Sequence, residues 1–212
     1  MTEASALLEL VLSEAGSDPV AETILDAALE EFLAYGLRRT NVDVVAKRAG
    51  VSRATLYRRF DGKDALVQAV LVRECRRFFS SIVEATSHLS TVEERLVEGF
   101  VVGVRYARED RLMNRLLASD PEALLPYLTV NGGLVIAVAR DFLVQQGDRL
   151  PKIATRTPAG VAEIFVRLAI SFTLTADSAI PLSSDEQVRA FARGYLAPLM
   201  RPNDTRPNEQ ND

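Results

Sequence analysis

The segment from Val42 to Phe60 constrains the fold of this chain most, because it contains two helical patterns too short to be stable alone. The first runs over Val42–Ala49 and the second over Arg53–Phe60, with the turn Gly50-Val51-Ser52 between them. Isolated helices shorter than about 12 residues are marginal in water, so each must pack against the other and against neighbouring helices. The segment is therefore predicted to be a helix-turn-helix unit.

Individual residues in this segment fit such packing. Gly50 lies in the turn, where glycine readily adopts a left-handed backbone conformation, and Ala46 is small at the predicted crossing of the two helices. The apolar positions form a predicted buried seam of Val45, Ala49, Val51, Leu56 and Phe60. The outward face of the second helix then consists of Arg53, Thr55, Tyr57, Arg58 and Arg59. Side chains of these types bind phosphates and the edges of bases.

The charge of the chain is concentrated around the same segment. The whole chain carries a net charge of −4, yet from Gly36 to Lys63 eight basic residues stand against two acidic ones. A local positive excess in an acidic protein indicates a face for nucleic acid, because the nucleic-acid backbone is uniformly negative. A solvated cationic surface without a partner is the alternative interpretation of the charge alone.

The rest of the chain also has helical patterns, so the predicted fold class is all-α. Asp18-Pro19 combines a capping carboxylate with a proline in the first turn, and the apolar repeat after it ends at Gly36. Gly132-Gly133 weakens the middle of one long pattern, which is predicted to be two helices or one kinked helix. The further predicted helices are Lys63–Ala85, Thr91–Glu109, Arg111–Ala118, Pro121–Gln146, Pro158–Thr175 and Asp185–Met200.

The N-terminal quarter of the chain resembles a known family. The stretch from Thr40 to Phe60, followed by Gly62 to Leu66, resembles the TetR family of transcription regulators in residue type and in gapless spacing. Ala28, Phe32 and Gly36 also fit the first helix of that family. Beyond this region, only the helical character and the length of the chain are similar.

The resemblance implies an all-α homodimer with an N-terminal three-helix helix-turn-helix domain and a C-terminal helical domain for ligand binding and dimerisation. Such a protein binds a palindromic operator of double-stranded DNA and usually represses, and a small ligand releases the DNA. The implied division is an N-terminal extension at 1–18, a DNA-binding domain at 19–66, an effector and dimerisation domain at 67–200 and a disordered tail at 201–212.

The DNA-binding residues follow from the resemblance position by position. The base-reading set is Arg53, Ala54, Thr55 and Tyr57, and the phosphate-binding set is Asn41, Tyr57, Arg58 and Lys63, with Arg59 added from the outward face of the helix. Lys63 opens the long helix, so its charge and the first backbone amides can bind one phosphate together. Val42 and Asp43 stand where many relatives carry groups that donate to DNA, and neither side chain can donate.

A ligand pocket is predicted in the region from Thr91 to Thr175, where helices are apolar around much of their circumference. Helices buried on several faces belong to a domain interior, so these residues are either plain core or the wall of a pocket. The predicted lining is Phe100, Arg105, Met113, Leu116, Phe142, Phe165 and Phe172. The ligand expected there is a small, mostly apolar molecule.

The last two predicted helices suggest a homodimer. Phe165, Leu168 and Phe172 recur at helical spacing in one, and Val188, Phe191, Tyr195 and Leu199 in the other. Two amphipathic helices at the end of a domain can close its own core or pair with a second subunit, and the resemblance favours the second arrangement.

Other functions find less support in the residues. An enzyme needs a placed acid, base, nucleophile or metal, and the sequence shows no such set, so neither catalysis nor a cofactor is predicted. A helical adaptor that binds an acidic protein is a further alternative. The single Cys75 excludes an internal disulfide, and the lone His88 is expected to be a surface or capping residue. The chain has no apolar run long enough to span a membrane and no basic region before its first apolar stretch, so a cytoplasmic location is expected.

Overall fold

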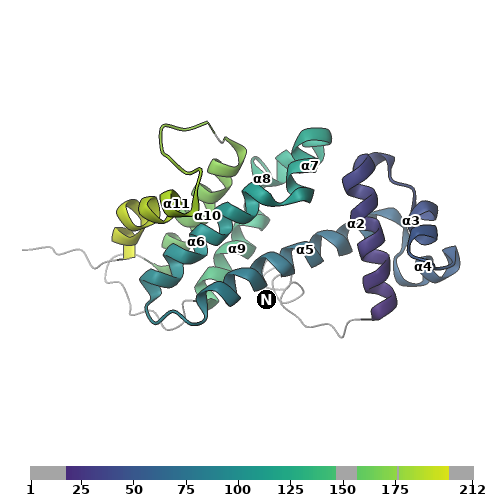
Figure 1. Cartoon of the computed structure of the whole chain (residues 1–212), viewed down its shortest axis with the longest axis horizontal. Helices are drawn as coiled ribbons and strands as arrows, with labels where there is room; N and C mark the ends of the chain where they lie inside the picture. Colours follow the sequence, from purple (N-terminus) through teal and green to yellow (C-terminus); the bar gives the residue numbers. More distant parts are fainter. Residues whose placement is uncertain (1–17, 147–156, 176, 201–212) are drawn as a thin grey trace, which may run out of the picture.

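The computed structural model describes residues 18–146, 157–175 and 177–200, and their regular secondary structure is helical (Figure 1). The predicted N-terminal extension before Asp18 and the predicted tail from Arg201 lie outside these ranges. Helices α2 to α4 form one end of the molecule, α5 leads away from them, and α6 to α11 pack around its far half. The predicted all-α class is confirmed.

The first helix, α2 (Pro19–Arg39), begins and bends where the sequence predicts. The Asp18 carboxylate accepts a hydrogen bond from the backbone N–H of Val20 at 3.0 Å, and Pro19 occupies the first turn. Gly36 has φ 80° and ψ 166°, so the regular helix is interrupted there and a last helical turn follows to Arg39. A left-handed φ at this position requires glycine, because a Cβ would meet the neighbouring carbonyl.

The predicted helix-turn-helix unit is present as α3 (Val42–Arg48) and α4 (Arg53–Arg59). The Asn41 side chain caps α3 by accepting from the N–H of Asp43 at 2.8 Å, and Ser52 caps α4 by accepting from the N–H of Thr55 at 3.0 Å. Gly50 adopts φ 68° in the turn. Capping residues and one glycine therefore define both short helices, as local sequence predicts.

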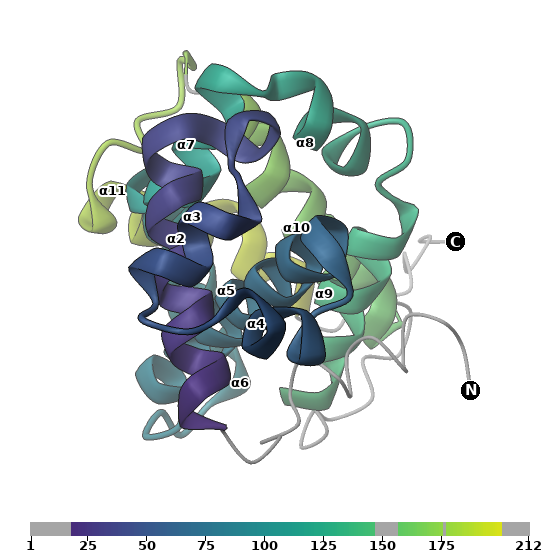
Figure 2. The ribbon, with the colours of Figure 1, turned by 90° about the vertical axis from the view of Figure 1, so that its right-hand side faces the viewer.

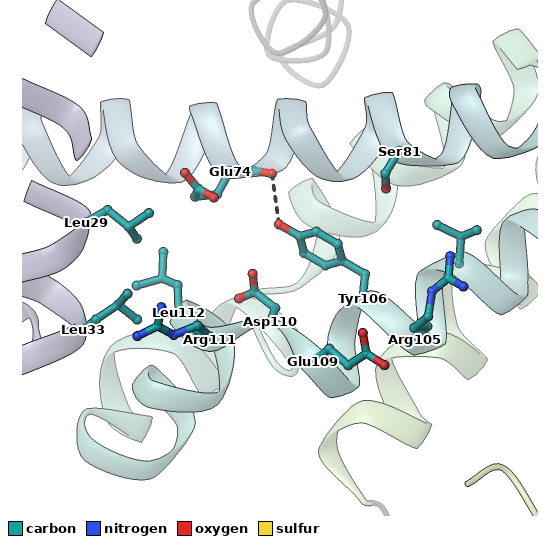
Figure 3. A pocket seen from close by; sticks show the side chains of 11 residues that line it. Leu29, Leu33, Glu74, Ser81, Arg105, Tyr106, Glu109, Asp110, Arg111 and Leu112 are labelled. Atoms are coloured by element: carbon teal, nitrogen blue, oxygen red, sulfur yellow. Dashed lines mark hydrogen bonds between the residues drawn. The ribbon is translucent and has the colours of Figure 1, made fainter. Parts of the chain in front are cut away.

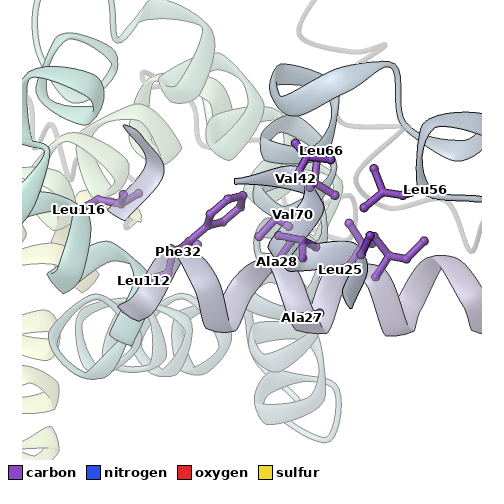
Figure 4. Packing of buried hydrophobic residues seen from close by; sticks show 13 residues of the cluster. Leu25, Ala27, Ala28, Phe32, Val42, Leu56, Leu66, Val70, Leu112 and Leu116 are labelled. Atoms are coloured by element: carbon purple, nitrogen blue, oxygen red, sulfur yellow. The ribbon is translucent and has the colours of Figure 1, made fainter. Parts of the chain in front are cut away.

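The core of this unit extends into the C-terminal part of the chain. Val45 and Leu56 of the predicted seam are fully buried, and the other three seam residues pack partly buried against them. Leu112 and Leu116 of α7 (Arg111–Ser119) join the same apolar cluster beside Phe32 of α2 (Figure 4). The helix-turn-helix end and α7 thus share one apolar cluster.

The long helices run close to their predicted bounds, with α5 at Gly62–Thr86 and α6 at Val92–Glu109. Thr91 and Glu94 cap α6 reciprocally, since each side chain accepts from the backbone N–H of the other. The segment with the double glycine is two helices, α8 (Pro121–Leu128) and α9 (Gly133–Gln146). Pro126 lies inside α8, and Thr129 to Gly132 form the connecting turn.

The last two helices differ in regularity. Helix α10 (Pro158–Leu174) is capped by Thr157, as predicted. The second is α-helical only at α11 (Asp185–Phe191) and continues as a π-helical turn, η1 (Ala192–Leu196), and a 3₁₀ turn, η2 (Ala197–Met200). The helix predicted over Asp185–Met200 is therefore present, but only its first half is α-helical.

Two further apolar clusters fill the C-terminal part. One brings α6, α10 and α11 together, with the Phe100 and Phe165 rings edge to face at a centroid distance of 5.9 Å. The other lies between α5, α6 and α9, where the rings of Phe79 and Phe142 stack at 4.2 Å. In the described part of the chain, no helix is long and apolar enough to cross a membrane.

Candidate DNA interface

Helix α4 lies with α2 and α3 at the end of the molecule that faces the viewer in Figure 2. Leu56 is fully buried and anchors the helix, which leaves Arg53, Ala54, Tyr57 and Arg58 exposed. A seven-residue helix with one buried anchor turns its remaining surface to solvent. The predicted base-reading residues thus occupy one accessible surface.

Arg53 is held in place on that surface by two neighbours. Its Nη1 donates to Oδ2 of Asp43 at 3.2 Å, its Nε lies 3.2 Å from Oδ1, and its guanidinium carbon lies 5.3 Å from the centre of the Tyr57 ring. Thr55 is partly buried, and its hydroxyl shares a hydrogen bond of 2.8 Å with that of Ser52. The polar groups of α4 are therefore ordered by contacts within the helix-turn-helix unit.

Asn41 and Lys63 lie at two helix starts beside this surface. The Asn41 carbonyl oxygen is used as the α3 cap, so its amide N–H groups remain as donors. Lys63 lies in the first turn of α5, and its ammonium donates to the backbone carbonyl of Arg38 at 2.8 Å. An ammonium has three N–H groups, so Lys63 can still contact a phosphate from this position.

Arg59 differs from the other predicted DNA-binding residues. Its Nε donates to the Asp18 carboxylate at 2.6 Å, and its side chain is only 22% exposed. The hydrogen bond from Arg59 holds the pKa of Asp18 below its usual value. Arg59 thus links the end of α4 to the start of α2, because the Asp18 carboxylate, which caps α2, lies next to it in the structure. It does not lie on the open face.

Several other basic residues of the segment are also paired. Arg48 binds Glu30 and Glu31 of α2 with contacts of 2.8 Å and 2.6 Å, and Arg38 binds Glu122 of α8 at 2.9 Å. These carboxylates lie far away in the sequence or on the preceding helix, so a count of charges between Gly36 and Lys63 overlooks them. The unpaired positive charge at this end is therefore smaller than the number of basic residues in the segment indicates.

A cavity of about 450 Å³ lies where α2 meets α5, α6 and α7 (Figure 3). Tyr106 of α6 donates to the backbone carbonyl of Glu74 on α5 at 3.5 Å, and Asp110 lies beside them. Burial, and then the charges of Asp110 and Glu74, raise the pKa of Tyr106. The lining residues are Leu29, Leu33, Glu74, Ser81, Val102, Arg105, Tyr106, Glu109, Asp110, Arg111 and Leu112. The cavity combines an apolar wall with a polar wall that carries both carboxylate and guanidinium groups.

Only Arg105 of the predicted ligand-binding residues lines this cavity, and it pairs with Asp185 of α11 at 2.8 Å. The other six do not line this cavity. Phe100, Phe165 and Phe172 pack around Phe191, Phe142 packs against Phe79, Leu116 belongs to the core of the DNA-binding end, and Met113 is half-buried on α7. These residues thus belong to separate apolar clusters, and one pocket lined by all of them stays a prediction, because helical periodicity shows that a face is buried but not what covers it.

The predicted dimer residues differ in burial. Phe165, Val188 and Phe191 are buried in the core of their own chain. Tyr195 of the predicted set is 71% exposed on η1, and Ile164 of α10, which the sequence did not single out, is 43% exposed.

Neither His88 nor Cys75 belongs to a metal-binding cluster of the described residues. The described residues contain no group of histidine, cysteine and carboxylate side chains that could hold a metal ion, and His88 is exposed after the end of α5. Cys75 is surface-accessible on α5, yet partial desolvation and then the charges of Glu74 and Asp110 raise the pKa of its thiol. The nearby arginines thus do not activate it.

Comparison with known proteins gives matches along most of the chain. Residues 24–70 match the family described as bacterial regulatory proteins, tetR family, and residues 92–193 match the bacterial tetracyclin repressor C-terminal domain. The uncharacterized HTH-type transcriptional regulator Rv1255c of Mycobacterium tuberculosis is 26% identical over 90% of both chains. The HTH-type transcriptional repressor Rv3405c of the same organism is 29% identical over 70% of this chain and 82% of its own.

Solved structures agree with the sequence matches. The TetR family repressor AlkX from Dietzia sp., implicated in biodegradation of n-alkanes, is 25% identical, with a TM-score of 0.59 over 89% of this chain and 97% of its own. The fatty acid degradation regulator FadR from Bacillus halodurans is 16% identical and has a TM-score of 0.57 over 89% and 98%. The second likeness concerns the fold alone.

Proposed function

The chain belongs to the TetR family of transcription regulators, which are DNA-binding proteins and not enzymes, and from this premise we propose that it is a repressor released from a palindromic operator by a small ligand. The observation that carries the proposal is the exposed face of α4, where Arg53, Tyr57 and Arg58 meet solvent at the tip of the molecule. Repression is supported by the names of two relatives, AlkX and Rv3405c, which are both repressors.

A homodimer supplies the second recognition helix that a palindrome needs. Two half-sites read from one side of the duplex lie one turn of DNA apart, ~34 Å, or a multiple of it. We place the dimer contact on Ile164 and Tyr195, because both are apolar and exposed while their neighbours Phe165 and Phe191 are buried. A contact through this face leaves the α4 surface free for DNA.

The cavity between α2 and α6 is the proposed ligand site. A ligand can shift a conformational equilibrium only by binding one state more tightly than the other. This cavity is lined by Leu29 and Leu33 of the DNA-binding end and by Tyr106 and Asp110 of the C-terminal part, so its shape depends on how the two parts are set. Its charged wall favours a ligand that carries polar groups beside an apolar body, rather than the mostly apolar molecule expected from the sequence.

Two hydrogen bonds tie the two parts of the chain together. The buried Asp120, between α7 and α8, accepts from the backbone N–H of Leu37 at 3.2 Å, and Arg115 donates to the carbonyl of Ala34 at 3.1 Å. Both bonds fix α7 and α8 to the C-terminal end of α2. Movement of α7 would therefore be transmitted to the helix-turn-helix unit.

Binding of the purified chain to duplexes selected from a random library tests the proposal. A palindromic consensus should emerge, and its affinity should fall steeply with salt, because neutralised phosphates release counterions. A thermal-shift screen of amphiphilic metabolites, followed by operator binding with each hit, tests the ligand. Selection that yields no consensus would refute the operator. Hits that stabilise the protein without changing operator affinity would refute the switch.

A further inference from the structure

Asp43 is an acidic residue on a surface that approaches a polyanion. It lies in the first turn of α3, its side chain is 50% exposed, and it neighbours the DNA-facing helix α4. Its carboxylate cannot donate to DNA and is repelled by phosphates. A residue that weakens DNA binding by its charge needs another role to explain its place on this surface.

The contacts of Asp43 indicate that role. Both of its carboxylate oxygens face the Arg53 guanidinium, at 3.2 Å from Nη1 and from Nε, while the Tyr57 ring lies against the same guanidinium at 5.3 Å. Arg53 nevertheless stays 67% exposed. The arginine is thus held from two sides and still presents its remaining N–H groups to solvent.

We propose that Asp43 is a specificity-determining residue that does not touch DNA but aims Arg53 at a guanine in the operator. The inference rests on the proposed operator binding and adds which base the site reads. Guanine offers two acceptors in the major groove, O6 and N7, and a guanidinium binds both at once. The Asp43 carboxylate is the positioning group, and Arg53 is the reading group.

Phosphates and base edges compete for the Arg53 guanidinium. An unrestrained arginine has many rotamers and can reach phosphates, which binds every sequence equally and adds no specificity. An arginine that is already paired with Asp43 and stacked on Tyr57 has fewer of these alternatives, and its free N–H groups stay available for a base edge. Asp43 should therefore weaken binding to random DNA and strengthen the preference for the operator.

The chain offers a matched control in Asp61, the other acidic residue of the basic segment. Asp61 is exposed at the start of α5, and its side chain makes no capping hydrogen bond. Asp61→Asn and Asp43→Asn remove the same charge from the same end of the molecule. Only Asp43→Asn releases Arg53.

The experiment measures dissociation constants of the full chain for the selected operator and for a random duplex, at two salt concentrations. Asp61→Asn should tighten both complexes about equally, by roughly twofold, through lost repulsion. Asp43→Asn should tighten the random complex similarly but weaken the operator complex, so that the ratio of the two constants falls about tenfold, and one guanine in each half-site should become tolerant of substitution. Arg53→Lys keeps the charge without the planar fork and should lose the same guanine preference.

The outcomes separate the two proposals. If the wild-type chain prefers no sequence, the proposed function is overturned, and this inference with it. If the wild-type chain prefers its operator but Asp43→Asn behaves like Asp61→Asn, or Arg53→Lys keeps the guanine preference, this inference alone is overturned. Thermal unfolding of each variant checks the fold, which an exposed ion pair supports only weakly.

Discussion

Replacing Gly36 by alanine should reveal how firmly the C-terminal part of the chain holds the first DNA-binding helix. Gly36 has φ 80°, and a Cβ built there would lie 2.5 Å from Oδ2 of the buried Asp120. A side chain at this φ costs about 1–2 kcal/mol in backbone strain alone. Displacing the carboxylate also breaks its hydrogen bond to the Leu37 N–H, and a bond to a charged group contributes about 1.5–3 kcal/mol. We expect Gly36→Ala to lower the free energy of unfolding by about 3 kcal/mol.

Two other glycines separate the contributions. Gly50 has φ 68° and nothing within 4 Å of its built Cβ, so Gly50→Ala should cost only the strain, about 1 kcal/mol. Gly133 has neither a left-handed φ nor a close neighbour, so Gly133→Ala should be neutral or stabilise its helix by up to about 1 kcal/mol. The three variants share one chemical change and differ in backbone conformation and in surroundings.

Urea unfolding followed by circular dichroism, at one protein concentration, measures these differences. In an Asp120→Ala background, which makes room for the Cβ, Gly36→Ala should cost only about as much as Gly50→Ala, because neighbouring changes are not additive. Equal losses for Gly36→Ala and Gly50→Ala in the wild-type background would show that Asp120 moves away freely. The tie between α2 and the α7–α8 corner would then be refuted.

Three further predictions concern DNA, the dimer and pH. Lys63→Ala should weaken operator and random DNA by a similar factor, whereas Thr55→Ala should mainly change base preference; equal losses for both variants in anisotropy titrations would contradict this division of roles. Tyr195→Glu should give a folded monomer in light scattering, whereas Phe191→Glu should unfold the chain by placing a charge in its core. If Tyr195→Glu is still a dimer, the interface lies elsewhere. The hydrogen bond from Arg189 lowers the pKa of Glu98 in the folded chain. The pair therefore stabilises the fold fully at pH values above the pKa that Glu98 has in the unfolded chain. This stabilisation is lost as the pH falls through the pKa that Glu98 has in the folded chain. Glu98→Gln should therefore lower unfolding stability by about 1 kcal/mol at pH 7 and by much less at pH 3, and a loss that is the same at both pH values would rule out the ion pair as its cause.

The contacts of two aspartates show which side-chain roles can be predicted from neighbouring residues in the sequence. Asp18 and Asp120 both precede a proline, and this dipeptide predicts a cap for the helix that follows. Asp18 caps α2, as predicted. Asp120 makes no capping hydrogen bond to α8 and instead accepts from Leu37, which lies 83 residues earlier in the chain. The same dipeptide thus has two roles, and only the second depends on a distant partner.

The features that the sequence alone determines are those set within a few residues. Helix starts follow from capping side chains such as Asn41 and Ser52, and the turn follows from Gly50, because these groups act on backbone atoms within one turn. The identity of the helix-turn-helix unit and the exposure of most of α4 follow from the same short-range pattern. These predictions therefore needed no knowledge of what packs around them.

The features that only the tertiary structure decides are the partners of buried and charged groups. Periodicity indicates that Phe142 and Leu116 face inward, but their neighbours come from other helices, so they belong to different clusters. The position of Arg59 along its helix predicts that it faces DNA. In the structure it donates instead to Asp18, which lies 41 residues away in the sequence. Burial is a property of one helix face, whereas a cavity or an ion pair is a property of two or more elements. Their relative placement depends on the packing of the whole chain.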